Sequence, residues 1–193
     1  MLDFIKGEIV GLLPTSVVLE VNGIGYEINI SLFSYSKLQK EKSCKLFIHQ
    51  VIREDAHLLF GFITVNEREI FRQLISVSGV GANTARMILS SMTPEEVRHA
   101  IATADVVLLK SIKGIGAKSA ERIIVDLKDK IIKSEDTSQL FKSSDNTIKN
   151  EALSALEVLG FSKKNSHKVV DRLLTTNSSM PVEELIKQAL KLL

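Results

Sequence analysis

The chain has little of the chemistry that secreted, membrane-spanning or disulfide-bonded proteins need. Its single cysteine, Cys44, excludes an intrachain disulfide framework and a cysteine-based zinc site. No apolar run approaches the length of a membrane span, and residues 1–6 lack a signal-peptide pattern. We therefore expect a protein of the cytosol with no membrane partner.

The sequence also lacks recognisable catalytic signatures. It contains no Gly-x-x-x-x-Gly-Lys-Ser/Thr phosphate loop, so any ATP hydrolysis would have to belong to a partner. Four histidines, His49, His57, His99 and His167, are scattered without paired metal-ligand spacing, which favours surface or packed side chains over ligands. The sequence predicts no metal, no cofactor and no catalytic residue.

Positive charge is scarce for a nucleic-acid-binding protein. The formal net charge of the 193 residues is only +2. It is −1 over residues 1–63, +3 over residues 64–133 and zero over residues 134–193. An excess this small usually reflects a solvated surface, but it coincides with the most informative feature of the chain.

That feature is a pattern that occurs twice, 35 residues apart. Each copy has glycine, a hydrophobic residue and glycine, followed by alanine and isoleucine at identical offsets. The two sets are Gly79, Val80, Gly81, Ala85, Ile88 and Gly114, Ile115, Gly116, Ala120, Ile123. Because apolar residues with helical spacing precede each copy, the sequence predicts a helix, a tight turn and a second helix, made twice.

Such a turn is suited to binding phosphate. Glycine adopts positive φ without a steric penalty, and the following helix presents unpaired N–H groups and the positive end of its dipole. A plain helix turn is the alternative for one copy alone. The dinucleotide fingerprint does not fit, because it needs a preceding strand and a third glycine where Thr84 and Ser119 stand. The repetition favours phosphate contact.

The arrangement resembles the tandem helix-hairpin-helix of proteins that grip DNA through backbone amides, with a preference for DNA structure over sequence. We expect Val80 and Ile115 to plug between helices, and Lys118 and Arg122 to add charge contacts. Asn83 occupies the position of Lys118 in the first copy, which must depend more on its amides and on Arg86. The predicted DNA-binding residues are Gly79, Val80, Gly81, Asn83, Arg86, Gly114, Ile115, Gly116, Lys118 and Arg122.

Residues 1–63 have the alternation and turn signals of a small β-domain. Five strands are predicted, at Ile5–Leu12, Val17–Val21, Tyr26–Ile30, Lys45–Arg53 and His57–Phe62. This number of short strands suits a closed OB-fold β-barrel, with an SH3-like barrel as the alternative. Between the hairpins, Thr93, Pro94 and Glu96 predict a capped helix start, and Asp105 predicts another.

The C-terminal part divides into a linker and a bundle. Residues 134–146 are polar without a sustained period and predict a flexible linker. Residues 147–193 predict three amphipathic helices, at about 148–158, 163–175 and 181–192, and resemble a UBA-like (ubiquitin-associated) fold. The predicted class is therefore α+β multidomain: a barrel at 1–63, a tandem helix-hairpin-helix domain at 64–133, a linker and a three-helix bundle.

Several motifs together resemble the RuvA family, the Holliday-junction-binding subunits of the bacterial branch-migration machine. They are the Gly23–Glu27 turn, the stretch Val51–Phe62 with its Arg53-Glu54-Asp55 turn, both Gly-x-Gly motifs and the separate small C-terminal domain. On spacing alone Glu54 and Asp55 form an ordinary solvated turn. The resemblance implies that they form an acidic pin near the crossover of a four-way junction. One departure is Ala82-Asn83, where the family commonly has Pro-Lys.

The resemblance also implies partners and an assembly. It implies a non-catalytic homotetramer, possibly a pair of tetramers, that binds Holliday junction DNA, works with the RuvB ATPase motor and meets the RuvC resolvase. Leu153, Leu156, Leu159 and Phe161 are the predicted motor-binding residues. Two alternatives stay open: a helix-hairpin-helix repair enzyme of the glycosylase or nuclease type, and a scaffold that never touches DNA. A glycosylase would need a catalytic Lys or Asp in a base pocket, for which the short tail leaves no obvious place.

Overall fold

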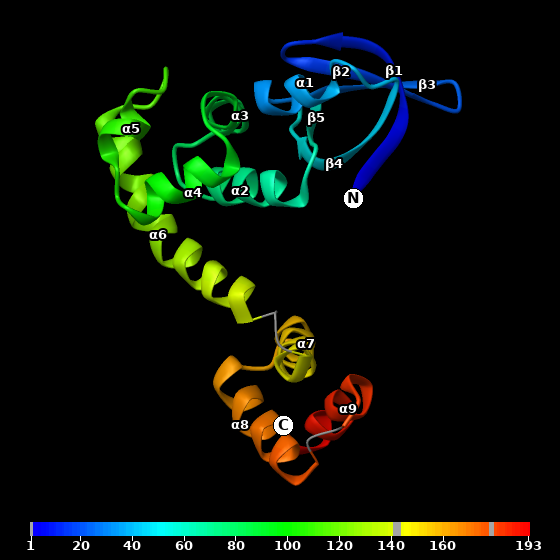
Figure 1. Cartoon of the computed structure of the whole chain (residues 1–193), viewed down its shortest axis with the longest axis vertical. Coiled ribbons are helices and arrows are strands. Elements are labelled where there is room, and N and C mark those ends of the chain that lie inside the picture. Colours follow the sequence, from blue (N-terminus) through cyan, green and yellow to red (C-terminus); the bar gives the residue numbers. More distant parts are fainter. Residues whose placement is uncertain (1, 141–143, 178–179) are drawn as a thin grey trace. The chain divides into compact units, whose positions relative to one another are not determined.

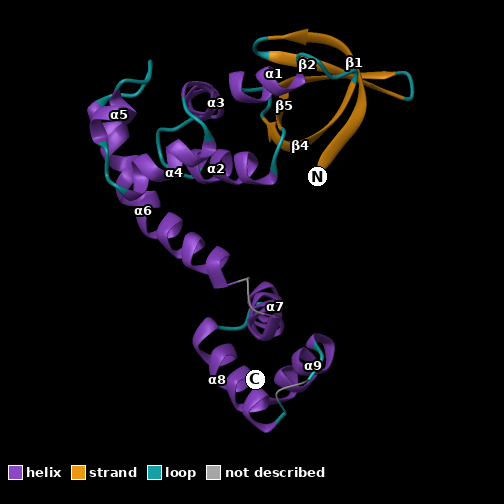
Figure 2. Cartoon of the chain, viewed as in Figure 1, coloured by secondary structure: helices purple, strands orange, loops and turns teal. Residues whose placement is uncertain are grey.

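The computed structural model describes residues 2–140, 144–177 and 180–193. The chain forms two compact units, one from Met1 to Ile132 and one from Lys133 to Leu193 (Figure 1). Strands are confined to the beginning of the first unit, and everything after them that is described is helix or loop (Figure 2). Within the described residues, no helix is both long enough and apolar enough to span a membrane.

The first unit begins with a closed barrel whose strands follow the order β1-β2-β3-β5-β4. The strands are β1 (Phe4–Leu13), β2 (Ser16–Val21), β3 (Ile24–Asn29), β4 (Ser43–Ile52) and β5 (His57–Phe62). Neighbouring strands are antiparallel except β3 and β5, which pair in parallel at Asn29 and Phe60. Five strands closed in this order fit the OB type that the sequence predicts.

Alternation along the strands fills the barrel. Val17 and Leu19 on β2 and Leu46 and Ile48 on β4 point inward and are completely buried, while their sequence neighbours are at least partly exposed. Side chains two residues apart share a face of a strand, so this period of two creates one apolar interior. Gly61 is required inside it, because a Cβ there would lie 2.5 Å from Ile28 Cγ2.

Helix α1 (Leu32–Leu38) lies between β3 and β4 and was not predicted. Its seven residues include serines and aromatics, which are weak helix formers, so propensity gives little signal. It forms because the Ser31 hydroxyl caps it by accepting from the Ser34 N–H, and because Leu38 packs into the barrel interior.

Five helices follow the barrel. They are α2 (Val65–Ile75), α3 (Ala82–Ser91), α4 (Pro94–Ala102), α5 (Val106–Lys110) and α6 (Ala117–Leu140). The predicted caps are confirmed: Thr93 and Glu96 form a capping box with Pro94 at the helix start, and Asp105 accepts from the Leu108 N–H. The α2–α3 and α5–α6 pairs are the two predicted hairpins.

The barrel and the hairpins share a hydrophobic core. Phe60 and Phe62 on β5 pack against Phe71 on α2, with ring centroids 5.2 Å and 4.8 Å apart. These three rings belong to one buried cluster with residues of α3 to α6. The segments predicted as separate domains at 1–63 and 64–133 are therefore packed together as one unit.

The segment predicted as a flexible linker, residues 134–146, is mostly helical in the structure. Helix α6 continues to Leu140 and α7 begins at Ser144, so most of residues 134–146 are helical, and residues 141–143 lie outside the described residues. The segment contains no glycine or proline, and extending an existing helix costs far less than nucleating a new one. Low apolar periodicity therefore does not by itself indicate irregular chain where no residue breaks the helix.

The second unit contains the three-helix bundle. Its helices are α7 (Ser144–Val158), α8 (Lys163–Thr176) and α9 (Val182–Leu192). Gly160 turns the chain after α7 with a φ of +95°, and the Ser162 hydroxyl caps α8. The core of the bundle consists of Ala152, Leu153, Leu156, Val170, Met180, Leu185 and Ala189.

Candidate nucleic-acid interface

The two hairpin turns have nearly the same geometry. Gly79 and Gly114 have φ values of +90° and +91°, a region that L side chains rarely adopt. The Val80 N–H donates to the Val77 carbonyl at 3.0 Å, and the Ile115 N–H donates to the Ile112 carbonyl at 3.0 Å. The repeat seen in the sequence is therefore a repeat in backbone conformation.

Each turn leads into a helix whose first amides precede the intrahelical hydrogen bonds. The first intrahelical bonds run from the Ala85 N–H to the Gly81 carbonyl at 2.9 Å, and from the Ala120 N–H to the Gly116 carbonyl at 3.0 Å. No side chain caps α3. A Cβ added to Gly81 or Gly116 would meet nothing within 4 Å. The space in front of both helix starts is open, as an anion-binding site requires.

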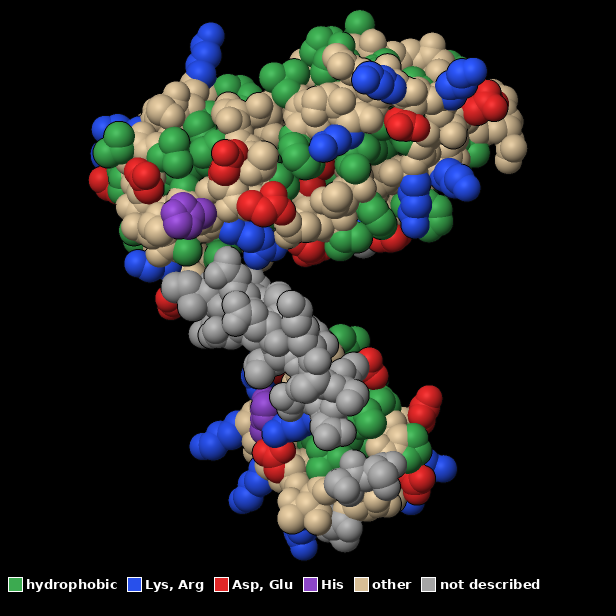
Figure 3. Space-filling model, viewed as in Figure 1, with side chains coloured by type: hydrophobic (Ala, Val, Ile, Leu, Met, Phe, Trp, Pro, Cys, Tyr) green, Lys and Arg blue, Asp and Glu red, His purple; other side chains and the backbone are tan. Residues whose placement is uncertain are grey.

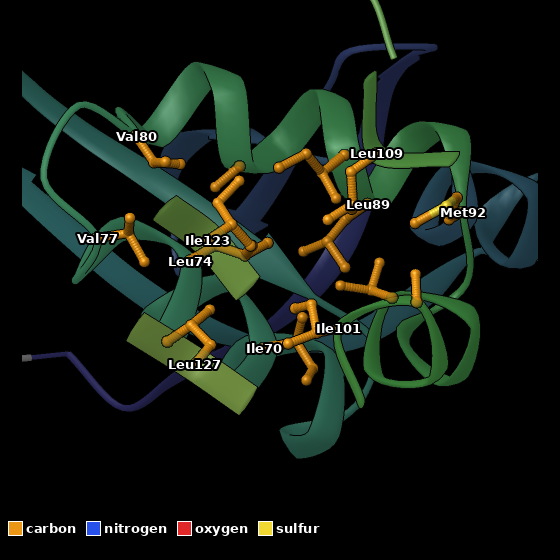
Figure 4. Close-up of a cluster of buried hydrophobic side chains, with 14 of the residues drawn as sticks. Ile70, Leu74, Val77, Val80, Leu89, Met92, Ile101, Leu109, Ile123 and Leu127 are labelled. Atoms are coloured by element: carbon orange, nitrogen blue, oxygen red, sulfur yellow. The ribbon is translucent and has the colours of Figure 1, made fainter. Parts of the chain in front are cut away.

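The hydrophobic residue of each motif is not part of this open surface. Val80 and Ile115 are each only 6% exposed, and Figure 4 shows Val80 pointing into the cluster of buried side chains that includes Leu74 and Ile123. Their amides are already bonded within the turn. Of the predicted DNA-binding residues, these two are structural, because a side chain between two packed helices cannot also reach a ligand.

A groove connects the two hairpins. It has a volume of about 490 Å³ and is lined by Ser78, Gly79, Lys118, Ser119, Glu121, Arg122, Val125 and Asp126. The Arg122 guanidinium donates to the Ser78 carbonyl at 3.3 Å, which joins α6 to the loop of the first hairpin. Ser78-Gly79 come from one hairpin and the other residues from the next, so the groove brings both motifs to one surface.

Charge on this surface is mixed. Lys118, Arg122 and Asn83 are exposed, as a contact with phosphate requires. Glu121 and Asp126 line the same groove as Lys118 and Arg122. The face of the chain shown in Figure 3 also has basic and acidic side chains interspersed. Attraction therefore depends on local amides and a few cations more than on a broad basic patch.

Arg86 makes a contact that the sequence does not predict. Its guanidinium donates to the Thr15 carbonyl at 2.9 Å and to Asn29 Oδ1 at 3.2 Å, both on the barrel. Partial burial holds the pKa of Arg86 below its ordinary value through desolvation. The sequence could not show this contact, because the partners lie 71 and 57 residues away and neither belongs to a recognisable motif.

The predicted acidic turn is present. It connects β4 to β5, and the Arg53 N–H closes it by donating to the Ala56 carbonyl at 2.8 Å. Glu54 and Asp55 are both exposed. The geometry is that of a solvated turn with two adjacent carboxylates at its tip, whose charge would repel a nearby phosphate.

The predicted motor-binding residues fall into two groups. Leu153 and Leu156 are 5% and 0% exposed and belong to the core of the bundle, so they are unavailable to a partner. Phe161 packs partly against that core. Leu159 is 58% exposed, and its neighbour Val158 is 87% exposed. The sequence does not single out Val158, which lies on the last turn of α7, off the face that carries Leu153 and Leu156.

These features define a class of protein: an OB-type barrel joined to a tandem helix-hairpin-helix with two matched glycine turns, followed by a small helical bundle. Comparison with known proteins agrees in all three parts. Residues 1–61 match the RuvA N terminal domain, residues 71–129 the SAM-like helix-hairpin-helix tandem, and residues 147–193 the RuvA C-terminal domain.

Full-length relatives identify the family. Proteins from Christiangramia forsetii, Flavobacterium psychrophilum and Azobacteroides pseudotrichonymphae are 50%, 51% and 53% identical to the chain. The first two alignments cover 99% of both sequences, and the third covers 100% of both. All three are named Holliday junction branch migration complex subunit RuvA. The chain belongs to the RuvA family, and the repair-enzyme alternative is not favoured.

Proposed function

We propose that the chain is a non-catalytic subunit that binds Holliday junctions and supports their branch migration in recombination and DNA repair. The observation that carries this proposal is the pair of matched hairpins, each with a positive-φ glycine and an open helix start, on either side of one groove. Two equivalent amide sites can hold two phosphates of a duplex without reading its sequence.

The amides at the helix starts are the principal ligands in this proposal. Gly79, Gly81, Gly114 and Gly116 let the sugar-phosphate backbone approach, while Lys118 and Arg122 contribute charge at the second hairpin. Asn83 offers the first hairpin a neutral polar contact in place of a lysine. The second hairpin should consequently contribute more of the salt-dependent part of binding.

The acidic turn supplies the specificity for branched DNA. Glu54 and Asp55 would lie near the crossover, where their charge repels phosphates and keeps exchanging strands apart. In a homotetramer, four copies of the turn would meet at the centre of the four arms.

The second unit would recruit the motor. We propose that ATP hydrolysis is performed by RuvB and that the exposed apolar pair Val158 and Leu159 at the end of α7 docks onto it. RuvC is the expected resolvase partner on the same junction. Because the ligand is chromosomal DNA, the proposed location is the cytoplasm.

A salt titration with two DNA substrates tests the proposal. The chain should bind a synthetic four-way junction much more tightly than a linear duplex of the same sequence, and both affinities should fall steeply as salt rises. Equal affinity for the two forms, at any salt concentration, would contradict junction recognition. Adding purified RuvB and ATP should then produce branch migration that neither protein gives alone.

A further inference from the structure

Arg86 connects the first hairpin to the barrel. It lies on α3, five residues after Gly81, and its guanidinium donates to the Thr15 carbonyl and to Asn29 Oδ1. Thr15 lies in the turn between β1 and β2, and its carbonyl also accepts from the Ile30 N–H at 3.1 Å. The contact therefore anchors the hairpin to a point where two strand ends are already fixed.

Asn29 extends this connection toward the acidic turn. Its Nδ2 donates to the Leu59 carbonyl at 3.2 Å, beside the parallel pairing of Asn29 with Phe60. Leu59 belongs to β5, which begins at His57, immediately after the turn that carries Glu54 and Asp55. A continuous chain of hydrogen bonds thus runs from the first hairpin, through one asparagine, to the strand that supports the acidic turn.

The internal repeat provides an independent argument about Arg86. Residues 35 apart are equivalent in the two hairpins, and the equivalent of Arg86 is Glu121. A position that is cationic in one copy and anionic in the other is not part of the phosphate site that both copies share. Glu121 is exposed, whereas Arg86 is partly buried against the barrel, as a residue specific to the first hairpin would be.

We propose that Arg86 is a positioning residue: it fixes the first hairpin relative to the acidic turn and thereby sets the preference for four-way over linear DNA. This inference rests on the proposed function. A linear duplex needs only the hairpins, so a looser joint should hardly affect it. A branched junction must contact the hairpins and the acidic turn at the same time, so the same loosening should weaken the binding of the junction.

Three variants and one control test the inference. Arg86→Met removes the donors and the charge, Arg86→Lys keeps the charge and a single donor nitrogen, and Asn29→Ala cuts the same connection without changing any charge. The control is Arg72→Met, which removes an arginine whose partner, Glu69, lies on the same helix. Affinities for a four-way junction and a linear duplex are measured across a range of salt, well below each melting temperature.

We expect Arg86→Met and Asn29→Ala each to reduce the ratio of junction affinity to duplex affinity about tenfold. Duplex affinity and its salt dependence should stay unchanged, Arg86→Lys should recover part of the ratio, and Arg72→Met should keep it. If Arg86 only stabilised the fold, replacing it would lower the melting temperature and leave the ratio of affinities intact, and that result would overturn the inference. So would a duplex salt slope that falls by about 0.9, the signature of a lost phosphate contact.

The same experiment separates this inference from the proposed function. If the unmodified chain shows no preference for the junction, the proposed function fails. If it shows the preference and Asn29→Ala retains it, the function stands and the role of Arg86 is refuted. A larger loss in the Arg86→Met, Asn29→Ala double variant than in either single variant would also contradict a single shared connection.

Discussion

Alanine at Gly81 or Gly116 should separate DNA binding from folding. Gly81 has a φ of −82°, and a Cβ at either glycine meets no atom within 4 Å, so the folded chain accepts the methyl group without strain. Alanine also restricts the unfolded chain, which stabilises a protein by about 0.4–1 kcal/mol at a compatible site. We therefore expect the melting temperature to stay equal or to rise slightly.

The effect on DNA should have the opposite sign. The methyl group would occupy the open space through which a phosphate approaches the helix start, and would keep its oxygen from the roughly 2.9 Å that an N–H bond needs. A hydrogen bond to a charged group contributes about 1.5–3 kcal/mol. Losing one should weaken binding roughly 10- to 100-fold, and the double variant should lose more than either single variant.

Fluorescence anisotropy with a labelled four-way junction measures the loss, and thermal melting followed by circular dichroism confirms the fold. The matched control is Gly25→Ala on β3, where the new Cβ would make an ordinary 3.5 Å contact with Val18 Cγ1. Gly79→Ala provides a contrast, because its positive φ should cost about 1–2 kcal/mol of stability. Wild-type affinity in a folded Gly81→Ala, Gly116→Ala double variant would refute the amide contact.

Three further predictions concern the acidic turn, the bundle and a buried carboxylate. Glu54→Gln with Asp55→Asn should spare overall affinity but change junction preference or migration rate, and a band-shift assay paired with a migration assay would expose a turn without function. Removing residues 144–193 should retain junction binding while abolishing stimulation of RuvB; lost DNA binding would instead place the bundle in the DNA site. Burial raises the pKa of Glu67, despite hydrogen bonds from the serines of α1 and its cap, so the folded state favours the protonated form. The free energy of unfolding of the unmodified chain, relative to that of Glu67→Gln, should therefore be greatest below about pH 4, the ordinary pKa of a glutamate in the unfolded chain. It should decline as the pH rises through the raised pKa of the folded state, as urea midpoints measured across pH would show.

Features encoded within a few residues could be predicted from the sequence. The hairpin glycines, the Thr93 capping box and the Asp105 cap each depend on neighbours no more than four positions away, and the structure confirms them. The five strands were found because alternation is also local. Helix α1 was missed because its stability comes from a serine cap and from packing, not from propensity.

Contacts between distant segments could not be predicted in the same way. Glu67 accepts hydrogen bonds from Ser31 and Ser34, more than 30 residues earlier, and Arg68 pairs with Asp3 at 2.7 Å. Each looks like an ordinary surface charge in a helical pattern. Their burial follows from how α2 packs on the barrel, which depends on the shared core and on no motif.

The two hairpins match at some positions because of local sequence and differ at others because of contacts with distant segments. The glycines, the plug residues and the small alanines agree because any phosphate-binding hairpin needs them. Arg86 differs from Glu121 because Arg86 binds the barrel while Glu121 lines the groove. Asn83 differs from Lys118, which also lines the groove, and both of these side chains are exposed. A duplicated motif thus serves as its own reference: agreement between copies marks the shared site, and disagreement marks what each copy does alone. By that criterion we expect the first hairpin mainly to orient the DNA relative to the acidic turn, and the second to contribute more of the attraction, as the salt dependence of the two sets of variants would show.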